Sequence, residues 1–253
     1  MGTPLVSLLI SYSGNAAKIA KLLARIESTR ATGVMIGWEV VLVNYGSLTG
    51  VSTVLNGLIS RYQWVRVVHH YSHRGASAAI RTGLKHVHAP FICTVDSDAN
   101  FLPENLPVMI EMLRDGADLV TATPSWNAED NTCLGIQGLL QCAAGVFYKL
   151  VHGSTMQSFV PIHRAYRRSL VERIHSRSAS SFVVGEIMVQ GRFHGFRVKE
   201  APVEPQVCSF DGSAITIFDS ILGHMCLLRM TAGMAGGGWM RQQMPWSRVA
   251  IEE

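Results

Sequence analysis

Charged residues, cysteine pairs and long apolar segments are all scarce in this sequence. Charged side chains make up 16% of its 253 residues, and the excess of Lys and Arg leaves a formal net charge of only +4. The basic residues are dispersed and form no stripe, which argues against a nucleic-acid-binding protein. No window approaches the roughly 18 consecutive apolar residues that a membrane-spanning helix needs. Because 48% of the residues are apolar, we instead expect a globular protein with a sizeable core.

The five cysteines are an odd number and include no C-x-x-C pair. This pattern argues against a disulfide framework or a zinc site and favours buried thiols in a reducing compartment. The N-terminus has no basic region followed by an apolar segment of the export type. We therefore expect a cytoplasmic protein. Its mildly basic charge suits anionic partners such as nucleotides, lipid phosphates or a membrane surface.

Apolar runs alternate with amphipathic segments over the first hundred residues. Short apolar runs predict strands at 5–12, 38–44, 65–68 and 91–95. Apolar residues at helical spacing predict helices at 15–28, 51–61 and 76–86. This alternation predicts an α/β fold, a Rossmann-like, mostly parallel sheet flanked by helices, with ligands at the carboxyl edge of the sheet.

The second half of the chain continues the pattern less regularly. We expect helices at 106–115, 134–151, 164–175, 183–193 and 218–230, and strands at 118–122, 158–160 and 196–200. The sequence shows no internal repeat and no clear linker, so residues 1–230 are predicted to form a single domain, followed by a peripheral or poorly ordered tail at 231–253. The helix at 218–230 and the tryptophans after it have the composition of an interfacial membrane anchor, although packing in a homodimer or on the sheet explains the helix equally well.

Two carboxylates follow the fourth predicted strand directly. Asp96 and Asp98 are two residues apart at the end of an apolar run, so an extended chain would aim both at the same point. Asn100 supplies a third oxygen nearby. Oxygen ligands that leave room for water and phosphate suit Mg²⁺ or Mn²⁺. We therefore predict a metal site at Asp96, Asp98 and Asn100, the alternative being an ordinary acidic turn.

Basic residues near predicted strand ends are candidates for phosphate binding. Arg74 lies just before the helix predicted at 76–86, and Arg81 lies within it. Arg164, Arg167 and Arg168 either face a phosphate or form a solvated helix face. His69, His70 and His73 follow the third strand and can reach a ligand there, or simply lie in a surface loop.

Glu186 is the one carboxylate in an otherwise apolar late helix. Burial would raise its pKa and make it a general base, whereas pairing with an arginine would make it structural. Both interpretations remain open from the sequence.

Taken in order, these segments resemble the inverting family 2 glycosyltransferases of the GT-A fold, most closely the polyprenol (dolichol) phosphate mannosyltransferases. The resemblance extends from about residue 5 to residue 228. The residues that carry it are Val6–Ile10, Gly46-Ser47, Gly75, Gly83, Asp96-Ser97-Asp98, Pro103-Glu104, Gln157-Ser158-Phe159, Arg167, Gly185–Met188 and Val198–Val203.

The resemblance implies a nucleotide-sugar donor, GDP- or UDP-linked, and a divalent cation held on the donor diphosphate. It implies roles in donor binding for Ser11, Tyr12, Asn44, Gly46, Arg74, Gly75, Arg81, Asp96 and Ser97. Asp98 and Glu186 are the implied catalytic residues, and Arg164, Arg167 and Arg192 the implied contacts to the acceptor phosphate. The acceptor itself, a lipid phosphate or a small molecule, is left open.

Several charged positions of the family are altered here. Asn44-Tyr45 replaces a pair of carboxylates that grip the nucleotide, Pro124 replaces an arginine, and Ala214 replaces a lysine. An amide hydrogen-bonds a base but is not a charged acceptor. These losses predict an altered donor or acceptor, and they also fit a catalytically inactive module that binds a nucleotide or a partner. A nucleotidyltransferase is less favoured, because Ser11–Asn15 is not a long glycine-rich loop with basic residues for a triphosphate.

Overall fold

A computed structural model describes residues 4–12, 16–33, 35–45, 57, 60–70, 75–96, 103–124, 163–174, 183–203, 225 and 229. Its strands are β1 (Val6–Tyr12), β2 (Trp38–Asn44), β3 (Val65–His69), β4 (Phe91–Asp96), β5 (Leu119–Pro124), β6 (Arg164–Arg167) and β7 (Val198–Val203). Its helices are α1 (Ala16–Ala31), α3 (Gly75–His86), the 3₁₀ turn η1 (Pro103–Asn105), α4 (Leu106–Arg114), α6 (Arg168–Arg173) and α7 (Val183–Phe193).

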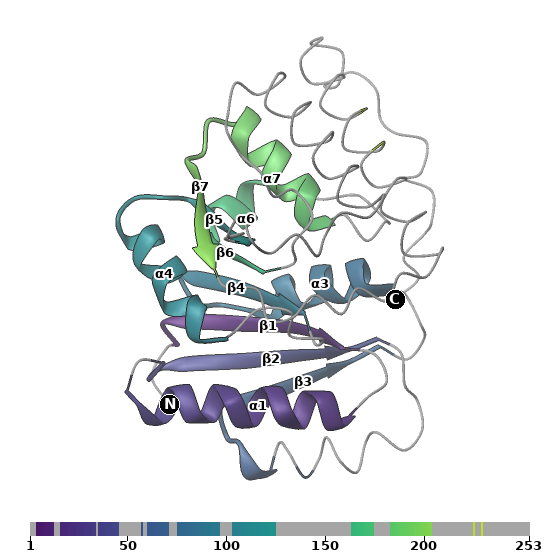
Figure 1. Cartoon of the computed structure of the whole chain (residues 1–253). Helices are drawn as coiled ribbons and strands as arrows, with labels where there is room; N and C mark the ends of the chain where they lie inside the picture. Colours follow the sequence, from purple (N-terminus) through teal and green to yellow (C-terminus); the bar gives the residue numbers. More distant parts are fainter. Residues whose placement is uncertain are drawn as a thin grey trace, which may run out of the picture.

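The seven strands form one sheet in the order β3-β2-β1-β4-β6-β5-β7 (Figure 1). β1 pairs in parallel with both β2 and β4, β2 pairs in parallel with β3, and β5 does so with β7. β6 is antiparallel to its neighbours β4 and β5. The mostly parallel α/β sheet predicted from the alternation of strands and helices is therefore confirmed, and the carboxyl ends of β1 to β5 share one edge.

Two hydrophobic clusters cover the two faces of the sheet. On one face α1 and α4 pack through residues such as Ile19, Leu23 and Ile110 against the β1 side chains Leu8 and Ile10. On the other face α3, α6 and α7 pack through Ile80, Leu170 and Ile187 against Leu9 and Val41. The two β1 sets alternate along the strand, as expected for a strand buried on both faces.

Glycine lets α3 lie close to the sheet. A Cβ added at Gly83 would lie 2.0 Å from Leu9 Cδ1 and 2.9 Å from Leu9 Cγ. Leu9 is itself buried in the centre of the sheet. The space for α3 on β1 therefore depends on the missing side chain at position 83.

The prediction of a basic helix at 164–175 is wrong for its first four residues. Residues 164–167 form β6, and only Arg168–Arg173 are helical. The strand inserts between β4 and β5 and pairs with both, so its backbone groups are satisfied by the sheet. The insertion also buries Arg164, Ala165 and Tyr166. The charge composition of the segment alone did not indicate this burial.

Several predicted segments lie outside the described residues. These are the helix at 134–151, the strand at 158–160, the tail at 231–253 and all but isolated residues of the helices at 51–61 and 218–230. Among the helices that the structure does describe, none has the length and apolarity to cross a bilayer.

Candidate active site

The carboxyl ends of β1, β2 and β4 place several predicted site residues at one edge. In the sheet register Ser11 lies opposite Asp96, and Tyr12 lies opposite Asn44. Ser11, Tyr12 and Asn44 are all buried. The backbone N–H of Tyr45 donates to the carbonyl of Tyr12 at 3.0 Å, which holds the ends of β1 and β2 together. Asp96 is thus delivered to the edge beside the residues expected to bind the donor.

Asn44 contacts a histidine from the next strand. Its amide Nδ2 lies 3.5 Å from Nδ1 of His69, and the two residues face each other in the β2–β3 register. The next histidine has a different partner, since His70 Nε2 lies 2.8 Å from Oγ1 of Thr82 on α3. These contacts tie the ends of β2 and β3 and the helix α3 into the same polar region.

Helix α3 begins at this edge. Its first residue, Gly75, has φ of +76°, a conformation that favours glycine. Because α3 connects the end of β3 to the start of β4, its N-terminus and the backbone N–H groups there belong to the carboxyl edge. A helix N-terminus attracts phosphate, and the implied role of Gly75 beside a diphosphate stays a prediction.

Arg164 is an internal cation on the far side of β4. Its side chain is 0% exposed, it pairs in register with Thr94, and Nη1 donates to the carbonyl of Val184 on α7. Burial lowers the pKa of Arg164, and Tyr166 and Glu200 oppose that effect. Thr94 is two residues before Asp96, so of the arginines predicted to contact phosphate Arg164 is the one nearest the candidate metal site along the sheet.

Glu186 lies in the first turn of α7 and is buried. Gln190 Nε2 donates to its Oε1 at 3.0 Å, and its charge acts on Arg81 of α3. Burial lowers the pKa of Arg81, and Glu186 opposes that effect. The charge of Glu186 is thus close enough to act on an arginine, and its role as a general base or as a structural partner stays a prediction.

Arg167 and Arg192, for which the resemblance implies contact with the acceptor phosphate, lie away from this edge. Arg167 pairs in register with Phe91, the first residue of β4. Its guanidinium donates to the carbonyls of Ala117, at 2.9 Å, and Leu113. Arg192 is in the last turn of α7, just before the loop that meets the start of β5. Antiparallel β6 and the direction of α7 carry both residues to the amino edge.

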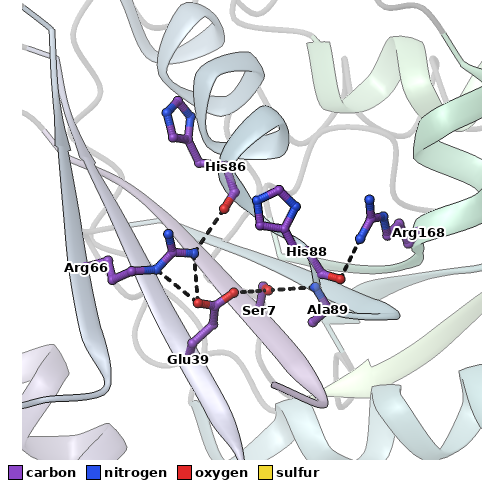
Figure 2. Close-up of polar contacts among 7 residues, drawn as sticks. All are labelled: Ser7, Glu39, Arg66, His86, His88, Ala89 and Arg168. Atoms are coloured by element: carbon purple, nitrogen blue, oxygen red, sulfur yellow. Dashed lines mark hydrogen bonds and ion pairs between the residues drawn. The ribbon is translucent and has the colours of Figure 1, made fainter. Parts of the chain in front are cut away.

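A polar network holds that opposite, amino edge together (Figure 2). Glu39 accepts hydrogen bonds from Ser7 at 2.6 Å and from Arg66 at 2.8 Å. Arg66 also donates to the carbonyl of His86 at the end of α3. Arg168 donates to the carbonyl of His88 at 2.6 Å. These contacts join β1, β2, β3, α3 and α6 at the edge away from Asp96.

The remaining predicted site residues lie outside the described part of the chain, namely Gly46, Arg74, Ser97, Asp98 and Asn100. The described residues alone contain no cluster of three or more His, Cys, Asp or Glu residues able to hold a metal ion. At this edge the register places Ser11 beside Asp96, and Asp98 and Asn100, which follow in the sequence, are further oxygen donors by residue type. Such a donor set fits Mg²⁺ or Mn²⁺.

Two features of this region were missed from the sequence. One is the contact of Asn44 with His69, since three histidines after a strand gave no indication of which would meet a neighbouring strand. The other is the internal strand that carries Arg164. The alternation of Arg164 and Tyr166 on one side of a short segment was the available signal, but four residues are too few to distinguish a strand from a helical turn.

Comparison with known proteins identifies the family. Residues 15–174 match the family described as glycosyl transferase family 2, which is more than half of the chain. The chain is 26% identical over 206 residues to undecaprenyl-phosphate 4-deoxy-4-formamido-L-arabinose transferase of Salmonella typhimurium. It is 26% identical over 180 residues to the protein of that name from Erwinia tasmaniensis. The matches cover 78% and 68% of this chain but only 58% and 53% of those relatives, so it spans little more than half their length.

Solved structures with the same fold include mannosyl-3-phosphoglycerate synthase from Rubrobacter xylanophilus, with a TM-score of 0.68 at 14% identity over 98% of this chain and 79% of that one. Glucosyl-3-phosphoglycerate synthase from Mycobacterium tuberculosis, in complex with Mn²⁺, UDP and phosphoglyceric acid, has a TM-score of 0.64 at 14% identity, covering 91% and 79%. Mannosyltransferase PcManGT from Pyrobaculum calidifontis, in complex with GDP-Man and Mn²⁺, has a TM-score of 0.59 at 16% identity, covering 96% and 77%. At these identities the likeness establishes the GT-A fold, and the match over residues 15–174 establishes that the chain belongs to glycosyl transferase family 2.

Proposed function

We propose that this protein transfers a sugar from a nucleoside diphosphate donor to a phosphate-bearing acceptor, with inversion at the anomeric carbon. The observation that carries the proposal is the sheet register that sets Asp96 beside Ser11, in a chain that belongs to glycosyl transferase family 2. Similar proteins support the substrate classes, since structures of the same fold were solved with Mn²⁺ and UDP or GDP-Man.

Donor binding would fall to the ends of β1 and β2 and the start of α3. The floor of the donor site would be made by Ser11, Tyr12 and Asn44, which lie beside Asp96. The N-terminus of α3 at Gly75 would attract the donor diphosphate. Asp96, Asp98 and Asn100 would hold Mg²⁺ or Mn²⁺. That cation, when bound, supplies positive charge against the negative charge that develops on the departing diphosphate.

The Asn44–His69 pair would contact the donor without a negatively charged side chain. The family position of Asn44 is normally a carboxylate, whereas here an amide lies 3.5 Å from the imidazole of His69. The pair offers hydrogen-bonding groups to a base or ribose without a formal negative charge. We propose that it selects the nucleoside by hydrogen bonding alone.

The acceptor side would be the region of Arg164, next to the end of β4. The curated relatives are named for undecaprenyl phosphate, and two of the similar structures are a glucosyl-3-phosphoglycerate synthase and a mannosyl-3-phosphoglycerate synthase. A phosphate is already ionised and attacks the anomeric carbon without a strong general base, so transfer to such an acceptor would not depend on Glu186 as a base. Pro124 and Ala214, at positions where the resemblance expects cations, predict weaker use of a simple polyprenyl phosphate than in the mannosyltransferases.

Calorimetry tests donor binding. UDP and GDP are titrated into the full chain with and without Mn²⁺, and into Asp98→Asn. We expect Mn²⁺-dependent binding of one nucleotide, weakened at least tenfold by Asp98→Asn because one carboxylate of the metal site is lost. Asp115→Asn is the matched control, since Asp115 is an exposed aspartate at the end of α4 near the amino edge. Equal metal-dependent binding by wild type and Asp98→Asn would remove the metal-site assignment.

Turnover separates an enzyme from an inactive binding module. UDP- and GDP-sugars are incubated with Mn²⁺ and either a short polyprenyl phosphate or 3-phosphoglycerate, and the anomeric configuration of the product is read by NMR. Product with inverted configuration is expected for one acceptor. Nucleotide binding without any product from either acceptor would instead support the inactive module.

A further inference from the structure

A cavity of about 430 Å³ lies between α3, α6 and α7, on the face of the sheet opposite α1 and α4. Its volume is within the range of small-molecule sites in proteins. Its apolar walls are Leu84, Val87, Ile92, Val171, Ile174 and Ile187. The charged side chains around it come from the last turns of α3 and from α6.

The charges around the cavity do not balance. Arg168 Nε lies 2.7 Å from Glu172 Oε1, and Arg81 is offset by Glu186. Lys85 also lines the cavity, and it makes no ion pair within the described part of the chain. The cavity therefore combines apolar walls with an excess positive charge at Lys85.

The cavity lies toward the edge of the sheet opposite Asp96, although Arg81, which the resemblance implies in donor binding, is one of its lining residues. It reaches β4 at Ile92, four residues before Asp96, which corresponds to about 13 Å along a strand. Helix α6, which supplies Val171 and Glu172, begins at the amino edge, where Arg168 bonds the carbonyls of His88 and Pro90. The two sites thus lie toward opposite edges of the sheet.

We propose that this cavity binds an amphiphilic anion, with a phosphate or carboxylate group at Lys85 and an apolar chain against the walls. The volume of the cavity is the reason that the proposed ligand includes an apolar chain. At about 30 Å³ for each water in the liquid, the cavity would hold roughly fourteen waters, so an inorganic phosphate would leave most of the apolar wall in contact with water. Each buried methylene of a chain contributes favourably by removing that contact.

Calorimetry with octyl phosphate below its micelle-forming concentration tests the proposal, in buffer without nucleotide or metal. The result is therefore independent of the proposed sugar transfer. We expect octyl phosphate to bind at least tenfold more tightly than inorganic phosphate or octanol, because each of these lacks one half of the interaction. Lys85→Gln should weaken octyl phosphate binding about tenfold through loss of the charged contact. Val171→Phe should abolish it by filling the cavity.

Lys21→Gln is the matched control, an exposed lysine on α1 on the other face of the sheet. The affinity of this variant for octyl phosphate should equal that of the wild type. Sedimentation with phosphatidylglycerol vesicles, compared with pure phosphatidylcholine, identifies the source of the anion. Lys85-dependent binding to these vesicles indicates a lipid headgroup, and binding of monomeric octyl phosphate alone indicates a free amphiphile. No binding in either arm, or binding that Lys85→Gln leaves unchanged, overturns the proposal whether or not Val171→Phe folds.

Discussion

His163 is an imidazole held in the interior immediately before β6. It is 4% exposed, and burial lowers its pKa to about 3. In the unfolded chain a histidine titrates near pH 6.5. Between these two values the unfolded state binds a proton that the folded state does not, so stability falls as the pH is lowered through about 6.5.

We expect this residue to lower the free energy of unfolding by about 1.4 kcal/mol between pH 7.5 and pH 5.5. Urea denaturation at both pH values measures the loss. His163→Gln removes the titrating group, so its loss over the same interval should be smaller by that amount. The quantity compared is the change in unfolding free energy between the two pH values within each protein, because the substitution also changes stability by itself. An identical pH dependence in both proteins would show that His163 binds its proton equally in the folded and unfolded states, which would contradict the lowered pKa.

At the scale of elements, the packing of α3 on β1 depends on Gly83. Alanine is the better helix former by about 1 kcal/mol. However, its Cβ at position 83 would lie 2.0 Å from Leu9 Cδ1, and Leu9 is itself buried in the core. We expect Gly83→Ala to destabilise the fold by about 1 to 3 kcal/mol, the usual cost of overpacking a core.

Gly191 on α7 is the matched control for this prediction. A Cβ there would meet Leu170 Cδ1 at 3.5 Å and Ile174 Cδ1 at 3.6 Å, which are ordinary contacts. Gly191→Ala should therefore leave stability unchanged or raise it by up to about 1 kcal/mol. Thermal and urea unfolding of both variants provides the measurement, and a stabilised Gly83→Ala would mean that α3 moves away from the sheet at little cost.

At the scale of the whole molecule, the two edges of the sheet have different tasks. The amino edge carries the network of Glu39 with Ser7 and Arg66 (Figure 2). The carboxyl edge carries Asp96. We expect Glu39→Ala to cost about 1 to 2 kcal/mol of stability, because it leaves the buried Ser7 hydroxyl without that acceptor. It should leave Mn²⁺-dependent nucleotide binding unchanged.

Asp96→Asn should behave in the opposite way, with nucleotide binding reduced at least tenfold and little change in unfolding. Calorimetry and urea denaturation on both variants separate the two effects. If Glu39→Ala altered nucleotide affinity as strongly as Asp96→Asn, the two edges would be coupled and this division of tasks would be wrong.

The sequence by itself determined the α/β class, the parallel pairing of the first strands and the position of Asp96 at a strand end. Hydrophobic periodicity and chain direction are local properties, and the short connections of a βαβ chain leave few ways to pair its strands. The peripheral membrane contact, the homodimer and the 231–253 tail stay predictions, because their segments lie outside the described residues.

Only the tertiary structure decided where the arginines lie. Arg164 and Arg167 are three residues apart, yet antiparallel β6 buries the first beside Thr94 and carries the second to the start of β4. Likewise, the charge of Glu186 acts on Arg81 although the two residues are more than 100 positions apart, and the cavity at Lys85 exists only once α3, α6 and α7 cover the same face. Such contacts depend on strand order and helix placement, which are set by the packing of the whole core and are not encoded in any short stretch of the chain.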